Sequence, residues 1–497
     1  MCIPTTTRRC WSPIRRDQID RYLPSDSDFI DEALIWSVLE RNRHPDPSRV
    51  RDIMEKSKQC DALSLDDTAT LLNVEDPGLR EEMAQAAAAI KRRVYNNRIV
   101  TFAPLYLSNL CVNDCQYCGF RSSNTEQQRR RLTCDEVQEE IRVLAGDIGH
   151  KRLIVVYGEH PQSSTDYIGE TIEAIYGVKV KTCGGTGEIR RVNVNAAPLP
   201  IDDLRLLKEI GIGTFQVFQE TYHHDTYRRV HPPGTIKGDY RWRLTCMHRA
   251  QEAGVDDVGL GVLFGLYDWK FEVMGLLCHA QELENRFGIG PHTISFPRLE
   301  PAQNVDVSPF SKYTVDDPSF KHLVTVLRLA VPYTGLIITA RETPAIRDEM
   351  MTGACTQTDA STRIGVGAYA SAAGNQHIER QQFLLGDTRS LEDLTCDLAR
   401  QGVITSFCTA GYRCGRTGTC IMDMLKSGKE GKLCKINAVL TFREWLDDFA
   451  GTQALKICTP VLESEIAEIR EAAQPRFFTA FMDRYNRICQ GERDLYF

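Results

Sequence analysis

Three cysteines stand close together at Cys111, Cys115 and Cys118, in the spacing C-x3-C-x2-C. Three thiolates this close in sequence can bind three irons of a [4Fe-4S] cubane and leave the fourth iron without a protein ligand. The preceding run, residues 99–107, is apolar and β-branched, so we predict a strand that ends at the cysteine loop. A structural zinc site is the alternative, but it would need a second cysteine or histidine pair close by in the sequence, and none stands there.

The aromatic Tyr117 directly precedes the third cysteine. With it, the motif resembles the signature of radical-SAM enzymes, in which the amino and carboxylate groups of S-adenosylmethionine (SAM) chelate the open iron. The resemblance implies two cofactors, a [4Fe-4S] cluster on the three cysteines and SAM, with Tyr117 among the residues that bind them.

From about residue 98, strand-like and helical segments alternate, which predicts a parallel sheet with right-handed crossovers. Strands are expected at 99–107, 152–158, 190–195, 212–219, 257–264, 292–298 and 335–340, and an eighth near 363–367. Eight such units within about 270 residues suit a closed (β/α)8 barrel, whose chemistry lies at the C-terminal ends of the strands. The three cysteines follow the first strand and belong to that end.

The regions on either side of the barrel have helical patterns, for example at 28–40, at 81–94 and from 441 to the end. The predicted fold class is therefore α/β, a radical-SAM (β/α)8 TIM barrel with N-terminal helices and a mainly helical C-terminal cluster-binding domain. We place the helical extension at 1–97, the barrel at 98–370 and the C-terminal domain at 371–497.

The composition excludes several classes of partner. A net charge of −7 gives no reason to expect nucleic acid or an anionic membrane surface, and no apolar run approaches the ~20 residues of a membrane span. Eighteen cysteines in a chain of this length indicate a reducing compartment rather than a disulfide framework. We expect a cytoplasmic protein, or one in an organellar matrix if the basic residues 1–16 are the remnant of a transit peptide.

Polar residues follow several of the predicted strands, where they would face the barrel mouth. Gly158 and Glu159 end the second strand; the glycine allows close approach of SAM, and the adjacent groups can accept from its ammonium. Asn195 ends the third strand and Glu220 follows the fourth, both placed for contact with cofactor or substrate. The alternative for each is a structural role at a strand end.

Arg341 follows the seventh strand. Arginine can clamp a carboxylate with two parallel hydrogen bonds, and an amino-acid substrate has a carboxylate to clamp. The alternative is a structural ion pair with the neighbouring Glu342.

A second group of cysteines, Cys408, Cys414, Cys420 and Cys434, lies in a glycine- and arginine-rich stretch. Glycines leave the backbone free to wrap an inorganic core, which favours a second iron–sulfur cluster. Chance clustering in a cysteine-rich chain is the alternative. His292 opens the sixth strand and therefore lies at the barrel end opposite the first cluster.

Taken together, the motifs from about residue 60 to the tail resemble the HydG family, the radical-SAM tyrosine lyases that act as [FeFe]-hydrogenase maturases. The matching segments are Cys111–Cys118, Gly158–Pro161, Phe218–Tyr222, Gly254–Tyr267, Gly290–Ser295 and Cys408–Gly418. The resemblance implies that the Cα–Cβ bond of L-tyrosine is cleaved to p-cresol and dehydroglycine. It further implies conversion of dehydroglycine to CO and cyanide, for assembly of the hydrogenase H-cluster, at a second cluster with an extra iron.

The resemblance also implies partners and roles. A reductant such as ferredoxin or flavodoxin and the other hydrogenase maturases are the expected protein partners. Arg341 would hold the tyrosine carboxylate and act with Glu220 in the catalytic site, while His292 would ligate the extra iron.

Two segments depart from the family. Its second motif is C-x2-C-x22-C; Cys408 and Cys434 match the two ends, but Gly411 stands in the middle. We favour Cys414 as the third ligand; Cys420 in its place and an altered second cluster are the alternatives. The run Thr358–Thr362 replaces the family's Ser-Ala-Gly-Ser. Two alternatives therefore stay open: the related tyrosine lyase of thiamine thiazole biosynthesis (ThiH), which stops at dehydroglycine, and a non-catalytic iron–sulfur carrier.

Overall fold

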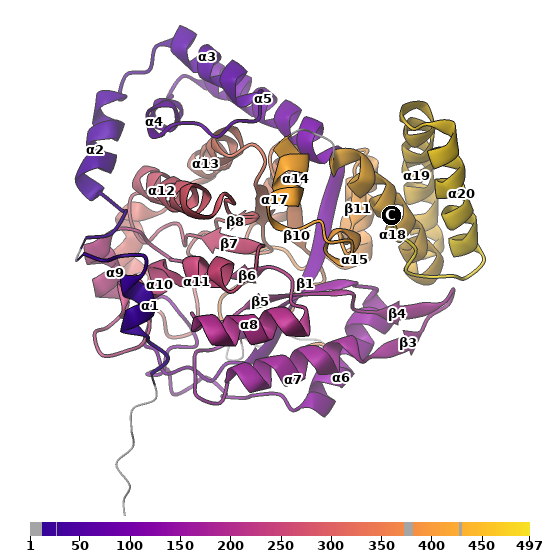
Figure 1. Ribbon diagram of the computed structural model, residues 1–497, viewed down its shortest axis with the longest axis horizontal. Helices are drawn as coiled ribbons and strands as arrows, with labels where there is room; N and C mark the ends of the chain where they lie inside the picture. Colours follow the sequence, from indigo (N-terminus) through magenta and orange to yellow (C-terminus); the bar gives the residue numbers. More distant parts are fainter. Residues whose placement is uncertain (1–11, 26, 372–380, 427–429) are drawn as a thin grey trace, which may run out of the picture.

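The computed structural model describes residues 12–25, 27–371, 381–426 and 430–497 (Figure 1). Within these residues, eight parallel strands form one closed ring: β1 Arg98–Ser108, β2 Arg152–Tyr157, β5 Arg191–Asn195, β6 Phe215–Gln216, β7 Val258–Gly261, β8 Thr293–Ser295, β9 Gly335–Ile338 and β10 Gln357–Asp359. The ring closes because β10 pairs with β1, with Gln357 beside Val100. The predicted (β/α)8 barrel is confirmed.

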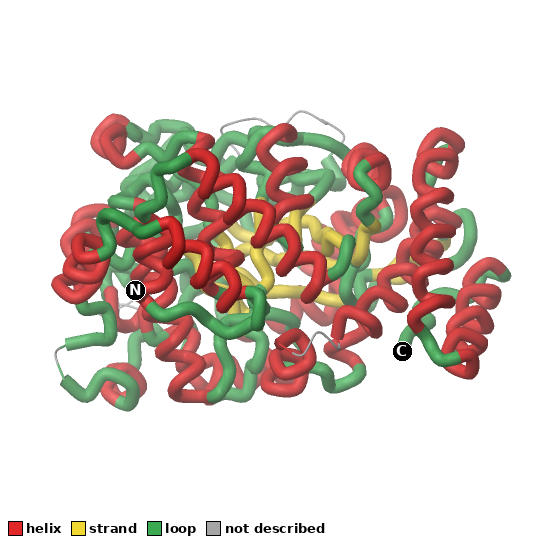
Figure 2. Tube along the Cα trace, turned by 90° about the horizontal axis from the view of Figure 1, so that it is seen from above, coloured by secondary structure: helices red, strands yellow, loops and turns green. Residues whose placement is uncertain are grey.

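Helices cover the outside of the ring, as Figures 1 and 2 show. They are α6 Cys134–Ile141, α7 Thr165–Tyr176, α8 Ile201–Ile210, α9 His224–Val230, α10 Tyr240–Leu244, α11 Cys246–Glu252, α12 Trp269–Phe287, α13 Asp317–Ala330 and α14 Pro344–Gly353. Local sequence sets their ends: Thr133 and Glu136 form a capping box at the start of α6, and Gly288 ends α12 in the left-handed conformation. A π-helical stretch, η1 Arg142–Ile148, continues α6, and a 3-10 helix, η2 Ser308–Tyr313, precedes α13.

The N-terminal region forms the helices α1 Arg16–Asp20, α2 Glu32–Arg41, α3 Pro47–Ser57, α4 Leu65–Leu72 and α5 Pro77–Tyr95. Aspartate or serine side chains cap the N-termini of α2 to α5. Helices α2 to α5 pack on α12, α13 and α14, and α1 packs on α10. The helices predicted at 28–40 and 81–94 are confirmed, with ends shifted by a few residues.

The C-terminal region contains α15 Leu391–Arg400, β11 Ile404–Ser406, α16 Ala410–Arg413, α17 Gly418–Lys426, α18 Glu430–Phe449, α19 Thr452–Ala472 and α20 Pro475–Cys489. Strand β11 pairs in parallel with the first residues of β1, Arg98 beside Ile404, so this region is joined to the barrel at the N-terminal ends of its strands. The helices α18, α19 and α20 pack together to one side of the barrel (Figure 1). The boundary at residue 370 stays a prediction.

Two strand predictions need correction. The eighth strand is β10 at 357–359 and not 363–367; it carries inward polar residues, Gln357 and Asp359, which an apolar pattern does not reveal. The segment 363–367 alternates apolar residues with glycine but ends at Gly367, in a turn with φ +72°. The fourth strand is limited to Phe215–Gln216, and the hairpin of β3 Lys179–Lys181 and β4 Thr186–Glu188 was not predicted.

Two glycines of β7 make room for side chains that follow or belong to the neighbouring strand β6. A Cβ atom at Gly261 would lie 2.3 Å from the Phe218 ring, and one at Gly259 would lie 2.7 Å from Gln216, so a side chain at either position would collide with these neighbours. Halfway along the axis, Phe102, Ile154 and Ile337 form a small apolar belt. A cavity lies above this belt, toward the C-terminal ends of the strands.

No helix in the described ranges is long and apolar enough to cross a membrane. Residues 1–11, which make up most of the basic segment at 1–16, lie outside those ranges.

Candidate active site

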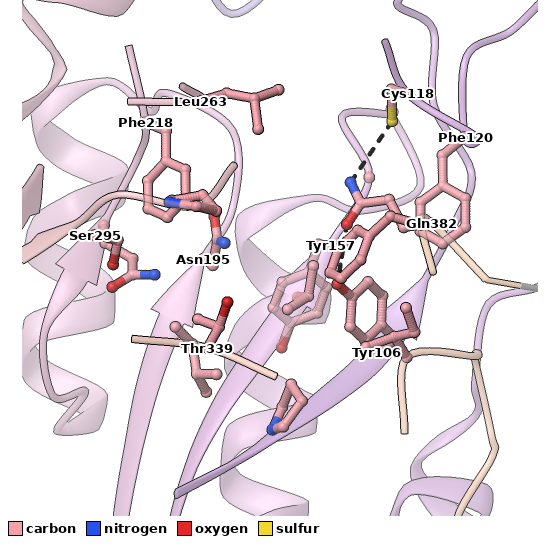
Figure 3. A pocket seen from close by; sticks show the side chains of 18 of the residues that line it. Tyr106, Cys118, Phe120, Tyr157, Asn195, Phe218, Leu263, Ser295, Thr339 and Gln382 are labelled. Atoms are coloured by element: carbon pink, nitrogen blue, oxygen red, sulfur yellow. Dashed lines mark hydrogen bonds between the residues drawn. The ribbon is translucent and has the colours of Figure 1, made fainter. Parts of the chain in front are cut away.

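A cavity of about 230 Å³ lies at the C-terminal ends of the barrel strands (Figure 3). It brings together nine residues predicted from the sequence: Cys111, Cys115, Tyr117, Cys118, Gly158, Glu159, Asn195, Glu220 and Arg341. They come from the C-terminal ends of four strands, β2, β5, β6 and β9, and from the loop after β1, so the closed barrel is what makes them neighbours.

The cysteine loop connects β1 with α6. It is fixed to the end of β2 by a hydrogen bond from the Val112 amide to the Glu159 carbonyl, 2.8 Å, and the Gln382 amide donates to the Cys118 sulfur at 3.6 Å (Figure 3). Burial raises the pKa of the Cys111 thiol to about 11 and also raises the pKa of Cys115. Binding of iron would therefore release protons from this loop.

The three thiols of this loop lie around one cavity. In the described part of the chain, no three Cys, His, Asp or Glu side chains converge closely enough to hold one metal ion. Cys111, Cys115 and Cys118 instead line one cavity together, as the ligands of a cubane several ångströms across would.

Glu159 provides an acceptor that no protein group uses. Its Oε2 accepts a hydrogen bond from the Asn113 amide, whereas its Oε1 is buried and has no partner among the described residues. An ammonium group such as that of SAM would satisfy this oxygen. We predicted that Gly158 allows close approach of SAM, but the structure gives another reason for a glycine here. A Cβ at this position would lie 2.2 Å from the Leu110 carbonyl oxygen, so the glycine is needed to pack the cysteine loop on β2.

Tyr117 is held by a hydrogen bond to a histidine that the sequence did not single out. The His231 Nδ1 lies 3.1 Å from the Tyr227 carbonyl and donates to it, so the Nε2 accepts from the Tyr117 hydroxyl at 2.8 Å. Burial raises the pKa of Tyr117 well above its usual value. The phenol thus stays neutral and its ring forms a fixed wall beside Cys115.

Glu220 lies in a buried ion cluster. Its carboxylate is 2.7 Å from the Lys237 Nζ and 3.5 Å from the Arg243 Nη2. Burial alone would raise the pKa of Glu220, but these two cations outweigh it and the pKa is lowered. The residue also has φ +74°, a strained conformation outside glycine that occurs often at functional sites.

Lys237 and Arg243 were missed in the sequence because they follow no recognisable motif. Lys237 lies in a loop after α9 and Arg243 on the short helix α10, and each reaches the cavity only through the tertiary fold.

Arg341 is a half-buried cation with no carboxylate partner among the described residues. It stacks on Phe383, with the guanidinium carbon 3.4 Å from the ring centroid, and donates to the Arg298 carbonyl at 3.4 Å. Glu342 binds Arg298 instead, at 3.0 Å, so the alternative Arg341–Glu342 pair does not form. Across the described ranges no carboxylate lies within ion-pair distance of Arg341.

Asn195 lines the same cavity, near Ser295 and Thr339 (Figure 3). Its side chain has no hydrogen-bond partner within the described residues and is available to a ligand. The replaced segment Thr358–Thr362 also reaches the cavity, where Thr362 donates to the Asp359 carboxylate at 2.7 Å.

A second, smaller cavity of about 20 Å³ lies at the opposite end of the barrel, lined by Cys408, Cys434 and Arg98. A hydrogen bond from Cys434, with help from Arg152, Arg98 and His292, lowers the pKa of the Cys408 thiol well below its usual value. The structure thus brings Cys408 and Cys434 together, with His292 near enough to act on Cys408 electrostatically.

Cys414 is not brought to this pair. Its thiol is exposed and lies 3.6 Å from the Phe497 carbonyl, and it does not line the small cavity. Gly411, which occupies the middle position of the family motif, does line it. Two thiols and an electropositive wall fit part of a cluster site, and among the described residues no third thiol lines this cavity.

Comparison with known proteins adds to these observations. The family model "Radical SAM superfamily" matches residues 105–275, and "Biotin and Thiamin Synthesis associated domain" matches 295–404. The 2-iminoacetate synthase of Escherichia coli K12 is 31% identical over 352 residues, which are 70% of this chain and 88% of that protein.

Solved structures extend the similarity to the C-terminal region. The crystal structure of HydG, a maturase of the [FeFe]-hydrogenase, aligns with a TM-score of 0.89 and 46% identity, over 95% of this chain and 100% of that one. HydG from Carboxydothermus hydrogenoformans aligns with a TM-score of 0.74 and 33% identity, over 95% and 99% of the two chains.

Proposed function

Because the chain belongs to the radical-SAM tyrosine lyases of the HydG and 2-iminoacetate synthase type, we propose that it cleaves the Cα–Cβ bond of L-tyrosine to p-cresol and dehydroglycine. The observation that carries this proposal is Arg341. It is a half-buried guanidinium that has no carboxylate partner within the described residues, and it lines the same cavity as the three cysteines. An amino-acid substrate supplies the missing anion.

Each residue of the cavity has a defined task in this proposal. Cys111, Cys115 and Cys118 would hold the cluster, and the free oxygen of Glu159 would accept from the SAM ammonium. When bound, cluster and SAM supply the radical that starts the reaction. Arg341 would fix the tyrosine carboxylate and thereby the position of the amino group.

Glu220 and Asn195 offer further hydrogen-bonding groups in the cavity wall. Glu220 stays ionised beside Lys237, so it can accept hydrogen bonds from bound hydroxyl or ammonium groups at neutral pH. Asn195 offers both a donor and an acceptor.

We further propose that dehydroglycine is converted to CO and cyanide at a second cluster held by Cys408 and Cys434, with His292 as ligand of an extra iron. The similarity to HydG over 95% of the chain and the lowered pKa of Cys408 support this step. Cys414 would have to leave its contact with Phe497 to serve as the third ligand. A reductant such as ferredoxin or flavodoxin, the other hydrogenase maturases as partners and a cytoplasmic location belong to the same proposal.

One observation favours a second candidate function. Gly411 supplies no thiol where the family motif has one, so a tyrosine lyase that stops at dehydroglycine, as ThiH does, is the alternative. A carrier without catalysis is disfavoured, because a carrier has no use for a deep cavity with a free arginine.

The test is anaerobic turnover of the reconstituted protein with SAM, dithionite and L-tyrosine. We expect p-cresol by chromatography and CO by trapping with deoxyhaemoglobin. Arg341→Gln should raise the KM for tyrosine at least tenfold, whereas the exposed Arg228→Gln should not change it. Turnover of SAM without tyrosine-dependent p-cresol would refute the lyase, and p-cresol without CO would select the second candidate.

A further inference from the structure

The segment 381–387 returns to the mouth of the barrel and packs directly on the cysteine loop. On its C-terminal side, the Gly386 amide donates to the Ala340 carbonyl at 2.8 Å, which fixes the segment to the end of β9. On the other side, a Cβ at Gly119, the residue after the third cysteine, would lie 2.9 Å from the Gln382 carbonyl oxygen. The glycine therefore lets the backbone at Gln382 come close to the cysteine loop.

The side chain of Gln382 joins Cys118 to a tyrosine of the first strand (Figure 3). Its Nε2 donates to the Cys118 sulfur at 3.6 Å, a usual distance for an acceptor as large as sulfur, and its Oε1 accepts from the Tyr106 hydroxyl at 2.9 Å. Tyr106 is buried, and burial raises the pKa of its phenol above the ordinary value. The hydroxyl therefore keeps the proton that it donates to Gln382.

The bond to Tyr106 decides which end of the amide faces the sulfur. A glutamine amide has a donor end and an acceptor end, and the hydrogen-bond network selects between the two orientations. Because the Tyr106 hydroxyl holds the Oε1, the N–H groups of Gln382 face Cys118. The opposite orientation would place the amide oxygen against the sulfur, and the two would repel each other once the sulfur is a thiolate.

A hydrogen bond to a cysteine sulfur has a consequence when that cysteine ligates iron. The inference below rests on the cluster of the proposed function, and not on its substrate. One-electron reduction adds one negative charge, which is shared between the irons and the sulfurs. An N–H group that faces a ligand sulfur stabilises the reduced form more than the oxidised form, because hydrogen bonds strengthen as the acceptor gains charge.

We propose that Gln382 raises the reduction potential of the cluster on the cysteine loop, through an amide that Tyr106 orients. The step concerned is the transfer of one electron from a reductant, dithionite in vitro, which converts [4Fe-4S]2+ to [4Fe-4S]+. Gln382 makes this transfer more favourable and takes no part in the cleavage of bonds.

Two cations near the loop act on the cysteines in another way. The Arg129 guanidinium donates to backbone carbonyls, at 2.6 to 3.2 Å, and the Lys237 Nζ pairs with Glu220 at 2.7 Å. Their charges influence the thiols from a distance. Gln382 is neutral and acts through one directed bond, so its replacement by another neutral side chain changes that bond and leaves the net charge of the site unchanged.

The test is a redox titration of the anaerobically reconstituted full chain, followed by EPR without SAM or tyrosine. Gln382→Met keeps the length of the side chain but removes the donor. At the midpoint potential of the parent chain, the ratio of reduced to oxidised cluster should fall at least about threefold, a factor that needs only part of the net free energy of one hydrogen bond. At 59 mV for a factor of ten, this is a shift of about 28 mV to more negative potential. The matched control, Gln128→Met, changes an exposed glutamine of the same loop and should leave the ratio unchanged.

An unchanged ratio in Gln382→Met would overturn the proposal. If that variant binds no cluster, Gln382→Asn takes its place, because the amide of asparagine is one methylene shorter and does not reach the sulfur; it should shift the ratio in the same direction, and an unchanged ratio would again overturn the proposal. Tyr106→Phe keeps the donor and removes the group that orients it, so its shift should have the same sign and be no larger than that of Gln382→Met.

The measurements are made in the Cys408→Ala/Cys434→Ala background, in which the cysteine loop alone supplies the EPR signal. The iron content of Gln382→Met should equal that of this background. Loss of iron with an unchanged ratio in the remaining cluster would show that Gln382 only helps to assemble the loop, and would refute the proposal. A shifted potential in a protein that forms no p-cresol would refute the proposed substrate and leave the role of Gln382 in place.

Discussion

Gly411→Cys tests whether one residue separates this chain from a complete second cluster site. Gly411 lines the small cavity with Cys408 and Cys434, and the substitution restores the spacing C-x2-C-x22-C. A Cβ at this position would meet nothing closer than the Arg416 carbonyl oxygen at 3.7 Å, which is ordinary contact. The backbone φ is negative, so no conformational strain opposes a side chain.

The expected effects follow from this geometry. Glycine inside a helix costs about 0.5–1 kcal/mol relative to alanine, so the variant should be at least as stable as the parent chain. A third thiolate at position 411 completes a site with one open iron without displacing Cys414, so a larger fraction of chains should carry the second cluster and the iron content per chain should rise. CO release should rise with it, while p-cresol formation should not change, because the upper cavity is untouched.

The assay is iron and sulfide analysis with EPR on anaerobically reconstituted protein, together with CO trapping. Gly411→Ser is the matched control, since it adds a side chain of similar size without a thiol. An iron content equal in Gly411→Cys, Gly411→Ser and the parent chain would refute the reasoning that position 411 lacks a ligand. If the parent chain already holds about eight irons and loses four in Cys414→Ala, the third ligand is Cys414.

Cys115→Ala should abolish formation of 5′-deoxyadenosine from SAM, measured by chromatography, and undiminished formation would remove the cysteine loop as the cluster site. Gly158→Ala should destabilise the protein by about 1–3 kcal/mol and reduce cluster loading, because its Cβ would collide with the Leu110 carbonyl; chemical unfolding and iron analysis measure the two effects, and a fully loaded, stable variant would contradict the clash. Lys237→Met should destabilise the protein by about 3 kcal/mol at pH 7, because it breaks a buried ion pair. The lowered pKa of Glu220 means that the pair stabilises the fold above the usual carboxyl pKa and that this contribution is lost as the pH falls through the lowered value, so the difference in unfolding free energy should shrink on acidification. A difference independent of pH would show that the pair is not what Lys237 contributes.

Features set by short sequence segments were predictable. The cysteine motif, the strand before it and the order of strands and helices follow from local spacing, and the closed barrel then places Glu159, Asn195 and Arg341 around one cavity. The sequence could not predict that Arg341 has no carboxylate partner among the described residues, because this depends on the ion pair that Glu342 forms with Arg298.

Features that depend on long-range contacts could not be predicted from the sequence. Lys237 and Arg243 become visible only when the loop after α9 and helix α10 fold over Glu220. For Cys414 the sequence was misleading. It lies only six residues from Cys408, which suggested that the two thiols are close, but the short helix α16 ends at Cys414 and leaves its thiol exposed.

The cavity inside the barrel also decides how the protein responds to hydrostatic pressure. A barrel interior is normally filled by layers of branched side chains, but this one contains a cavity of about 230 Å³, and unfolding would eliminate that internal space. The volume decrease on unfolding scales with such voids, so compression favours the unfolded chain more than for a filled barrel of the same size. A ligand that fills the cavity reduces this volume decrease. The pressure at which the protein unfolds should therefore rise as the cavity is occupied.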